Sequence, residues 1–542
     1  MMIIRRKTDM EKRIMLNQLG YMNNREKIVT FVSDKPVKFA VKKSDGATCV
    51  YEGTANCRID SESAGQVVYT GDFTSVKEDG IYMIFAEGIG ESDYFVINDN
   101  PYRDLINKSI YFFYMQRCGC DLDKKYARNY AHAACHTGLA TVYGSDVKLE
   151  TSGGWHDAGD YGRYIVPAAM TVAQLLMAYE KYPDIEKITS NPSFTEMPAY
   201  LEEIKYELDF MMKLQAQDGR LYHKVTCRSF CSFVMPDEEK DELILSPASV
   251  TATADFAGVM AMAVRFYEPY DKEYAAKLAM AAKKAYDALD SYTLPGGFLN
   301  PEGIVTGQYE DECDEDERSF AAAAMYKAFG DNKYREDFEK IAASKIYHGY
   351  GWSDMGSYGN IEYITSGWDV TDSVKNTIID SMLELADRLL ILSENDAYGV
   401  ALDKNEYIWG SNLSVCNNGI HLMDAYEITG DLRYLTAAGR QLDYILGRNP
   451  LGLCYVTGCG VTPVMRPHHR PSGFKGKPIA GMLSGGPCDW LADPCAIDNC
   501  TGMAPAKCFV DMTGSYSTNE VTIYWNSALI LLMANLLKQD KL

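Results

Sequence analysis

The hydrophobic pattern of this chain changes once, close to Pro101. Before that residue, short runs rich in β-branched and aromatic residues recur at intervals of roughly ten residues, with turn-forming pairs such as Asp45-Gly46 between them. The runs are Lys27–Val32, Val37–Val41, Val67–Tyr69, Ile81–Phe85 and Tyr94–Ile97. This spacing predicts a β-sandwich domain over residues 1–100.

After Pro101 the hydrophobic residues follow the helical period of about 3.6 residues. The segments with this period are Thr171–Tyr182, Met197–Lys213, Asp255–Tyr267, Ala275–Leu289, Arg318–Phe329, Val374–Leu392, Asn418–Thr429, Leu432–Leu446 and Val521–Lys538. Long loops between them carry most of the Gly, His and Cys residues. The pattern predicts one barrel of paired helices over residues 101–542, with function in the loops at one end.

The charge balance excludes two classes of partner. The chain has 53 Lys and Arg residues against 75 Asp and Glu residues, a net charge of −22. Such a surface repels phosphate backbones and anionic lipid, so we expect neither a nucleic acid nor a membrane as partner. A neutral substrate fits better, and the 12% aromatic content would serve a sugar-binding cleft.

The fifteen cysteines do not indicate a disulfide framework, because their number is odd and their spacing does not repeat. Reduced thiols are typical of a cytosolic protein. The N-terminal residues carry positive charges but lack the apolar run of about 7–15 residues that a secretory leader needs. We therefore expect a cytoplasmic protein, or a secreted one if a leader has been removed.

The segment from Ser152 to Tyr164 reads SGGWHDAGDYGRY and holds two aspartates. Asp157 and Asp160 have a spacing that puts both carboxyl groups on one side of a turn or helix start. A predicted helix follows, and its positive end would favour the ionised form of both acids. Paired ionised carboxylates can hold and deprotonate a water molecule, although such a pair by itself more often caps a helix.

A further acid, Glu520, stands at the start of the last predicted helix. Its neighbours Tyr516, Val521 and Tyr524 are apolar or aromatic. Such surroundings raise the pKa of a carboxyl group, as a general acid near neutral pH requires. The alternative is a first-turn glutamate that only stabilises its helix.

Two more groups of residues combine chemistry-bearing side chains. The segment Arg466–Ser472 reads RPHHRPS, and its Arg and His side chains could donate hydrogen bonds to sugar hydroxyls or to a carboxylate, or bind a phosphate. Four residues of types that bind zinc, enough to close a structural tetrahedral site, are Cys118, Cys135, His136 and His156. Their spacing is not that of a zinc finger, and isolated cysteines are usually small buried hydrophobes.

Together these segments resemble glycoside hydrolase family 9, a cellulase family with an (α/α)6 barrel. The family's C-terminal signature of aromatic, acidic and amide residues is matched by Phe509, Asp511, Tyr516, Glu520, Thr522, Asn526 and Ser527. GGWHDAGDYGRY is similar to the catalytic-aspartate loop, and PHHR to the His-x-Arg segment. Residues 15–21 and 71–82 resemble the Ig-like module of many members. The resemblance implies an Ig-like β-sandwich over 1–100 and an (α/α)6-barrel catalytic domain over 101–542.

The resemblance also implies hydrolysis of β-1,4-glucosidic bonds in a single, inverting displacement. Asp160 matches the general base, Asp157 the second aspartate that helps to hold the water, and Glu520 the general acid. Because a water must fit between base and sugar, the two carboxyl groups are expected about 6.5–9.5 Å apart. Substrate contacts are implied for His223, His468, Arg470, Trp525 and Trp352.

Metal sites are implied as well. Cys118, Cys135, His136 and His156 match a structural zinc site of the Ig-bearing members. Because His156 directly precedes Asp157, this metal would brace the catalytic loop without joining the chemistry. Calcium is common in the family, and Asp316-Glu317 resembles one of its ligand pairs, although a charged first helical turn explains the pair equally well.

The expected substrate is therefore a β-glucan oligosaccharide or polysaccharide. Hydrolysis of cellodextrins or soluble β-glucan is the first hypothesis, and an endo-acting cellulase on polymeric glucan is the alternative. A non-catalytic glucan-binding protein would be expected to lack one of the three acids, and all three are present. A zinc hydrolase that uses His136 and His156 would need an open coordination position, which four protein ligands do not leave.

Overall fold

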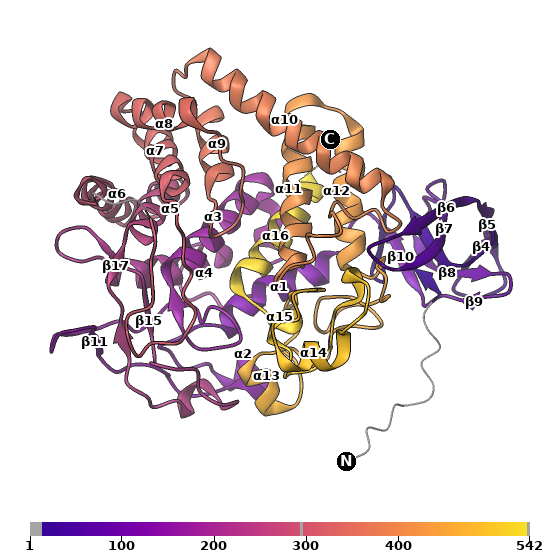
Figure 1. Ribbon diagram of the computed structural model, residues 1–542, viewed down its shortest axis with the longest axis horizontal. Helices are drawn as coiled ribbons and strands as arrows, with labels where there is room; N and C mark the ends of the chain where they lie inside the picture. The colour runs from indigo at the N-terminus through magenta and orange to yellow at the C-terminus, as the bar shows by residue number, and fades with distance from the viewer. Residues whose placement is uncertain (1–12, 293–295, 539–542) are drawn as a thin grey trace.

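The computed structural model describes residues 13–292 and 296–538. A β-rich part formed by residues 14–98 stands beside a larger helical part (Figure 1). The first twelve residues, on which the prediction of no secretory leader depends, lie outside the described residues, so the cellular location stays a prediction. Within the described ranges, no helix combines the length and the apolar character needed to cross a membrane.

The β-rich part consists of two sheets that share one hydrophobic core. The first has the order β1 (Ile14–Met15), β3 (Ile28–Val32), β7 (Gln66–Asp72), β6 (Cys57–Ser61). The second has the order β2 (Gly20–Met22), β10 (Phe95–Asn98), β8 (Gly80–Ala86), β4 (Val37–Lys43), β5 (Cys49–Ala55), with β9 (Gly90–Glu91) beside β8. Alternate residues such as Phe31, Phe39 and Ile84 fill the space between the sheets. All five predicted runs form strands.

Polar contacts join the β-rich part to the helical part. Arg440 donates two hydrogen bonds to the carboxylate of Glu26 (2.6 and 2.7 Å). The side-chain oxygen of Gln18 accepts hydrogen bonds from the backbone amides of residues 461 and 462 (2.9 and 2.8 Å). Gln18 thereby holds the loop that leads to the segment 466–472.

The helical part is built from long helices joined by loops that hold shorter elements. The long helices are α1 (Arg103–Met115), α3 (Ile165–Lys181), α4 (Ala199–Lys213), α5 (Val250–Tyr267), α6 (Lys272–Ala288), α7 (Glu315–Phe329), α8 (Asn332–Ser344), α9 (Gly356–Ile364), α10 (Asp372–Asn395), α11 (Ser411–Thr429), α12 (Leu432–Ile445) and α16 (Ile523–Lys538). The short helices include α2 (Lys124–Ala127), the 3-10 helix η1 (Arg128–Tyr130), α13 (Arg470–Lys475), α14 (Pro494–Cys500) and α15 (Tyr516–Asn519). A small sheet has the order β12 (Lys148–Leu149), β11 (Ala140–Val142), β16 (Ile244–Leu245), β15 (Lys224–Thr226), β13 (Arg163–Tyr164), and β14 (Leu221–Tyr222) pairs with β17 (Ala248–Ser249).

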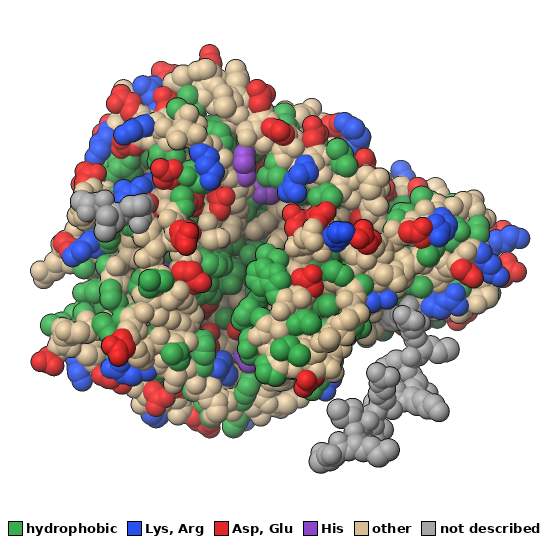
Figure 2. All heavy atoms as spheres, in the orientation of Figure 1, with side chains coloured by type: hydrophobic (Ala, Val, Ile, Leu, Met, Phe, Trp, Pro, Cys, Tyr) green, Lys and Arg blue, Asp and Glu red, His purple; other side chains and the backbone are tan. Residues whose placement is uncertain are grey.

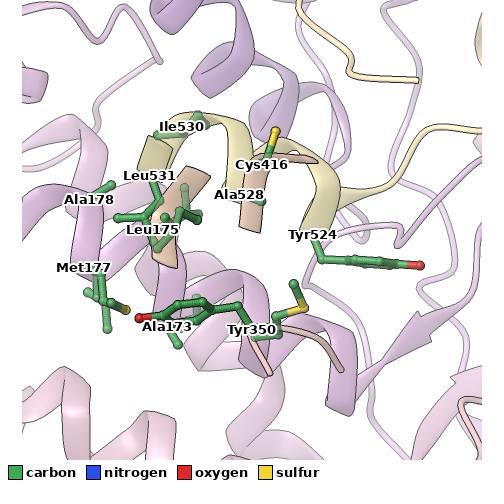
Figure 3. Close-up of a cluster of buried hydrophobic side chains, with 14 of the residues drawn as sticks. Ala173, Leu175, Met177, Ala178, Tyr350, Cys416, Tyr524, Ala528, Ile530 and Leu531 are labelled. Atoms are coloured by element: carbon green, nitrogen blue, oxygen red, sulfur yellow. The ribbon is translucent and has the colours of Figure 1, made fainter. Parts of the chain in front are cut away.

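The helices divide into central and surrounding ones according to their buried surface. Residues 523–537 of α16 are all buried, and α5 is nearly so, whereas α6, α8 and α12 bury one stripe each. α3 packs against α5 and α16, α5 against α7, α7 against α9, and α11 against α16. Figure 3 shows part of this core, where Leu175 of α3 lies close to Leu531 of α16.

Candidate active site

The loop 152–164 is held by two parts of the helical domain, the residues just after α1 and the strand β15. The backbone amide of His156 donates to the carbonyl of Gln116, just after α1 (2.8 Å), and β13 at the end of the loop pairs with β15. Asp157 and Asp160 are both buried, with 1% and 8% of their surface exposed. The loop therefore carries two carboxyl groups into the interior.

Asp157 is held in an environment that disfavours its charge. The hydroxyl of Tyr309 donates a short hydrogen bond to its Oδ2 atom, while Oδ1 has no hydrogen-bond partner among the described residues. Burial raises the pKa of Asp157 well above its ordinary value, and the neighbouring carboxyl group of Asp160 raises it further. For Asp157 the prediction that a helix N-terminus favours the ionised form is wrong, because α3 begins only at Ile165, eight residues later, and burial raises the pKa instead.

Asp160 receives hydrogen bonds from its own loop. Its Oδ2 atom accepts from the backbone N–H of Gly162 (2.9 Å) and from the hydroxyl of Tyr164 (3.1 Å). Tyr164 is itself fully buried, so its hydroxyl is fixed by packing. Together these donors orient the carboxylate of Asp160.

Glu520 lies between α15 and α16 in an extended conformation, and its backbone pairs with that of His468. The backbone N–H of Gly159 and the indole of Trp409 lie close enough to its carboxyl group to lower its pKa. The backbone N–H of Ile523, three residues after Glu520, donates a hydrogen bond to the carbonyl of Asp157 (2.8 Å), which holds Glu520 next to the aspartate loop. Burial raises the pKa of Glu520 to about 8, with a smaller contribution from Asp160. The direction of this shift agrees with the prediction from the apolar neighbours.

The segment 466–472 contacts the aspartate loop at Gly159. A Cβ atom at this position would lie 2.2 Å from the carbonyl oxygen of His468, so only glycine fits. The carbonyl of Gly159 accepts hydrogen bonds from the backbone N–H (3.0 Å) and the guanidinium (2.8 Å) of Arg470. The guanidinium also donates to the carbonyl of Cys231 (3.0 Å) and is 6% exposed. Arg470 therefore positions the loop, which argues against a phosphate site.

Aromatic rings line the space next to the acids. The partly exposed ring of His468 packs edge-on against Phe233 and Tyr516, with centroids 5.3 and 5.8 Å apart. The ring of Tyr516 lies 5.5 Å from that of Trp409, which is 38% exposed. Trp409 also lies beside Glu520, and sequence reasoning missed it because nothing near Trp409 in the chain marks it as part of the site.

The predicted stacking residue Trp352 is partly exposed and packs edge-on against Tyr309, the partner of Asp157, at 5.2 Å between centroids. This places Trp352 beside the site. The face shown in Figure 2 is hollowed between two halves of the helical part, and hydrophobic and acidic side chains gather in the hollow. Tyr309 is the second residue that the sequence did not reveal.

Two predicted substrate contacts are covered by other residues. His223 is fully buried, with its ring stacked on Phe298 at 3.7 Å and one ring nitrogen bonded to the carbonyl of Gln308 (3.0 Å). Trp525 is 2% exposed and packs beside Gly410. Neither side chain can touch a sugar in this structure, which corrects both predictions. His223 instead supports the segment that carries Tyr309.

The four predicted zinc ligands come together in the structure, and one of them, His156, directly precedes Asp157 in the sequence. Ligand atoms of Cys118, Cys135, His136 and His156 all lie within 4.8 Å of one another. The two sulfur atoms are 3.8 Å apart, and Sγ of Cys135 lies 3.7 Å from Nε2 of His156. These separations match the roughly 3.6–3.8 Å edges of a tetrahedron with zinc–sulfur and zinc–nitrogen bond lengths. The second ring nitrogen of His136 bonds to Glu239 (2.9 Å), as an outer partner of a metal ligand does.

The other predicted metal ligands belong to a cluster of buried acids. Asp316 and Glu317 lie in the first turn of α7 but are 1% and 0% exposed, so they do not form a solvated helix end. Both carboxyl oxygens of Glu317 and of Asp255, and one of Asp311, have no hydrogen-bond partner among the described residues. Burial raises the pKa of each of these four carboxyl groups, that of Asp316 to about 6. Unpartnered buried oxygens of this kind fit a hard cation such as calcium.

Comparison with known proteins extends over nearly the whole chain. A curated cellodextrinase from Butyrivibrio fibrisolvens is 36% identical, over 97% of this chain and 100% of its own length. Endoglucanase D from Acetivibrio thermocellus is also 36% identical, over 97% of this chain and 83% of its own. A solved structure of a thermostable endoglucanase mutant from Alicyclobacillus acidocaldarius matches with a TM-score of 0.92 at 35% identity, covering 97% of this chain and 99% of that one.

Two family models match separate parts of the sequence. The model of the cellulase N-terminal Ig-like domain covers residues 9–91, which include most of the two sheets. The model of glycosyl hydrolase family 9 covers residues 102–533, which include all three acids and both candidate metal sites. The chain belongs to glycosyl hydrolase family 9, with an N-terminal Ig-like domain before its helical catalytic part.

Proposed function

We propose that this protein hydrolyses β-1,4-glucosidic bonds of cellodextrins or soluble β-glucan with inversion at the anomeric carbon. The observation that carries the proposal is the hydrogen bond from the N–H of Ile523, three residues after Glu520, to the carbonyl of Asp157 (2.8 Å). It joins an acid with a raised pKa to the loop that holds two further carboxyl groups. Two relatives similar to this chain are a cellodextrinase and an endoglucanase, which supports the substrate class.

In this mechanism the three acids have different roles. With a pKa of about 8, Glu520 is protonated near neutral pH and can donate its proton to the leaving glycosidic oxygen. Asp160, oriented by Gly162 and Tyr164, accepts a proton from the attacking water. The unpartnered Oδ1 atom of Asp157 is available to hold that water, because Tyr309 occupies only Oδ2.

Substrate is proposed to lie along the aromatic side chains beside the acids. Trp352, Trp409 and Tyr516 offer partly exposed ring faces of the kind on which sugar rings stack. His468 stands next to Tyr516 and can accept a hydrogen bond from a sugar hydroxyl through Nε2, since Nδ1 donates to the carbonyl of Thr513 (2.7 Å).

The architecture suited to this site is an (α/α)6 barrel. We propose that α3, α5, α7, α9, α11 and α16 form its inner ring. Their sequential packing supports this, and contacts of Tyr350, just before α9, with α11 close the ring: its carbonyl accepts from Asn417 (2.9 Å) and its ring lies 4.7 Å from that of His421. On this basis the domain boundary is proposed at residues 100 and 101.

The stereochemistry and the products of hydrolysis test the proposed function. Proton NMR of cellotetraose hydrolysis is expected to show the α-anomer as the first product, because a water attacks opposite the leaving group in one step. Short products from the start would indicate a cellodextrinase, and mixed lengths from a soluble β-glucan an endo-acting enzyme. Initial formation of the β-anomer would contradict the mechanism, and no hydrolysis would favour a glucan-binding protein.

Zinc is proposed as the ion held by Cys118, Cys135, His136 and His156, where it would link α1 to the catalytic loop in a structural role. Removal of the metal, or Cys135→Ser, is expected to lower the melting temperature by at least about 5 °C. Metal content by mass spectrometry and scanning calorimetry measure this, with the exposed Cys49→Ser as matched control. Immediate loss of activity in a chelated but fully folded protein would favour a catalytic zinc instead.

Calcium is proposed for the cluster of Asp255, Asp311, Asp316 and Glu317. The support is the set of buried carboxyl oxygens without partners among the described residues. Burial of such oxygens costs free energy unless a cation binds them. The ion would tie the start of α7 to α5. Calorimetry of the chelated protein during calcium addition tests the proposal, and an unchanged melting temperature would contradict it.

The raised pKa of Glu520 predicts the alkaline limit of activity. A general acid works only while protonated, so kcat/KM is expected to fall as the pH rises through about 8. A pH profile measured with cellotetraose checks this, and a decline centred near the ordinary glutamate pKa would show that the site does not raise the pKa of Glu520.

A further inference from the structure

A second cavity lies away from the three acids, between elements that are distant in the sequence. It has a volume of about 870 Å³. Its walls are the outward face of α1, the segment from α2 through η1, and the residues that follow α13. This volume falls in the range of small-molecule sites.

Hydrogen bonds hold these walls together. The hydroxyl of Tyr111 on α1 donates to the carbonyl of Tyr126 on α2 (3.1 Å). The hydroxyl of Tyr130 in η1 donates to the carbonyl of Lys477, after α13 (2.5 Å). The cavity is therefore a built feature with defined walls, and the three tyrosine rings, each partly exposed, belong to its lining.

The charge of the cavity is opposite to that of the protein. Four exposed cations line it, namely Lys125, Arg128, Lys475 and Lys477. Among the described residues, no acidic side chain lies within ion-pair distance of these four. The single acid in the lining, Asp104, is paired with Lys108 at 2.6 Å. On a chain with a net charge of −22, such a cluster of unpaired cations makes a local site for an anion.

The combination of groups selects among anions. Tyrosine rings present apolar faces with polar edges, which suit sugar rings, and the amides of Asn107 and Asn129 can bond hydroxyl groups. Lysine and arginine bind carboxylates and phosphates. We propose that this cavity binds an acidic oligosaccharide, that is, a sugar chain bearing a uronic acid carboxylate, separately from the catalytic cleft.

The site has one structural connection to the cleft. α13 begins with Arg470, which grips Gly159 of the aspartate loop, and ends with Lys475, which lines the cavity. A glucan chain that carries acidic side groups would thus bind at the C-terminal end of α13, while the N-terminal end of α13 contacts the aspartate loop.

Isothermal titration calorimetry with a xylo-oligosaccharide that carries one glucuronic acid tests the proposal. The full-length protein is expected to bind this probe, and to bind its carboxyl-reduced form at least about tenfold more weakly. The double variant Lys125→Glu/Lys475→Glu should also lose about tenfold in affinity. The variant Lys35→Glu/Lys272→Glu changes the net charge equally at exposed positions outside the cavity and should bind as the wild type does.

Three results would overturn the proposal: equal binding of the carboxyl-reduced probe, unchanged affinity in Lys125→Glu/Lys475→Glu, or full displacement of the probe by equimolar inorganic phosphate. The last would assign the site to phosphate. Hydrolysis of cellotetraose by the double variant is expected to match that of the wild type, because neither lysine belongs to the catalytic groups. Failure of the cavity proposal would therefore leave the proposed glucanase function intact.

Discussion

Glu520→Gln is expected to reduce the hydrolysis of cellotetraose by about 10²–10⁴-fold, the usual contribution of a general acid. Glutamine keeps the shape of the side chain and an oxygen that can accept a hydrogen bond, but it has no acidic proton to give. The alkaline decline near pH 8 should disappear from the residual activity, because the group that titrates there is gone.

An activated substrate distinguishes loss of the acid from general damage. A cellobioside with a dinitrophenyl leaving group needs little protonation, so Glu520→Gln should retain much more of its activity on this substrate than on cellotetraose. The exposed Glu336→Gln serves as matched control and should behave as the wild type on both. An equal loss on both substrates would remove Glu520 from the role of acid.

Asp160→Asn is expected to reduce hydrolysis of cellotetraose at least as much as Glu520→Gln does. Its effect on the activated cellobioside should differ from that of Glu520→Gln. Asparagine can still accept from Gly162 and Tyr164, yet it cannot take a proton from water. Activity is expected to fall by about 10²–10⁴-fold on cellotetraose and on the activated cellobioside alike, because both need a deprotonated water.

Azide provides the decisive measurement for Asp160→Asn. As an anion it attacks the anomeric carbon without losing a proton, so it should restore turnover and yield a glycosyl azide of inverted configuration. Asp146→Asn, at an exposed position, is the control and should show neither the loss nor the rescue. Failure of azide to rescue a folded Asp160→Asn protein, together with azide rescue of Asp157→Asn, would exchange the roles of the two aspartates.

The order of elements was largely predictable because it rests on local periodicity. All five β-rich runs became strands, and the nine helical segments overlap helices. α8 could have been found, since Tyr334, Phe338 and Ala342 recur at helical spacing and are its buried residues. α9 could not, because its sequence GSYGNIEYI has poor helix formers, and it is helical through burial between neighbours.

The chemical groups of the site were also visible in the chain, since each stands in a segment of unusual composition. Their environment was not. The helix start expected to ionise Asp157 begins eight residues later, at Ile165, and burial dominates its pKa instead. Covering by Phe298 removes His223 from the substrate, and no local pattern carries information on such a contact 75 residues away.

By itself, the sequence determined the two-part organisation, the three acids and the four zinc-type ligands. Only the tertiary structure decided which side chains complete the site, namely Tyr309 on Asp157 and Trp409 on Glu520. It also gathered four cations into one cavity of an acidic protein. The physical reason is that residue type and period act locally, whereas desolvation, hydrogen bonding and charge clustering depend on segments that only folding brings together.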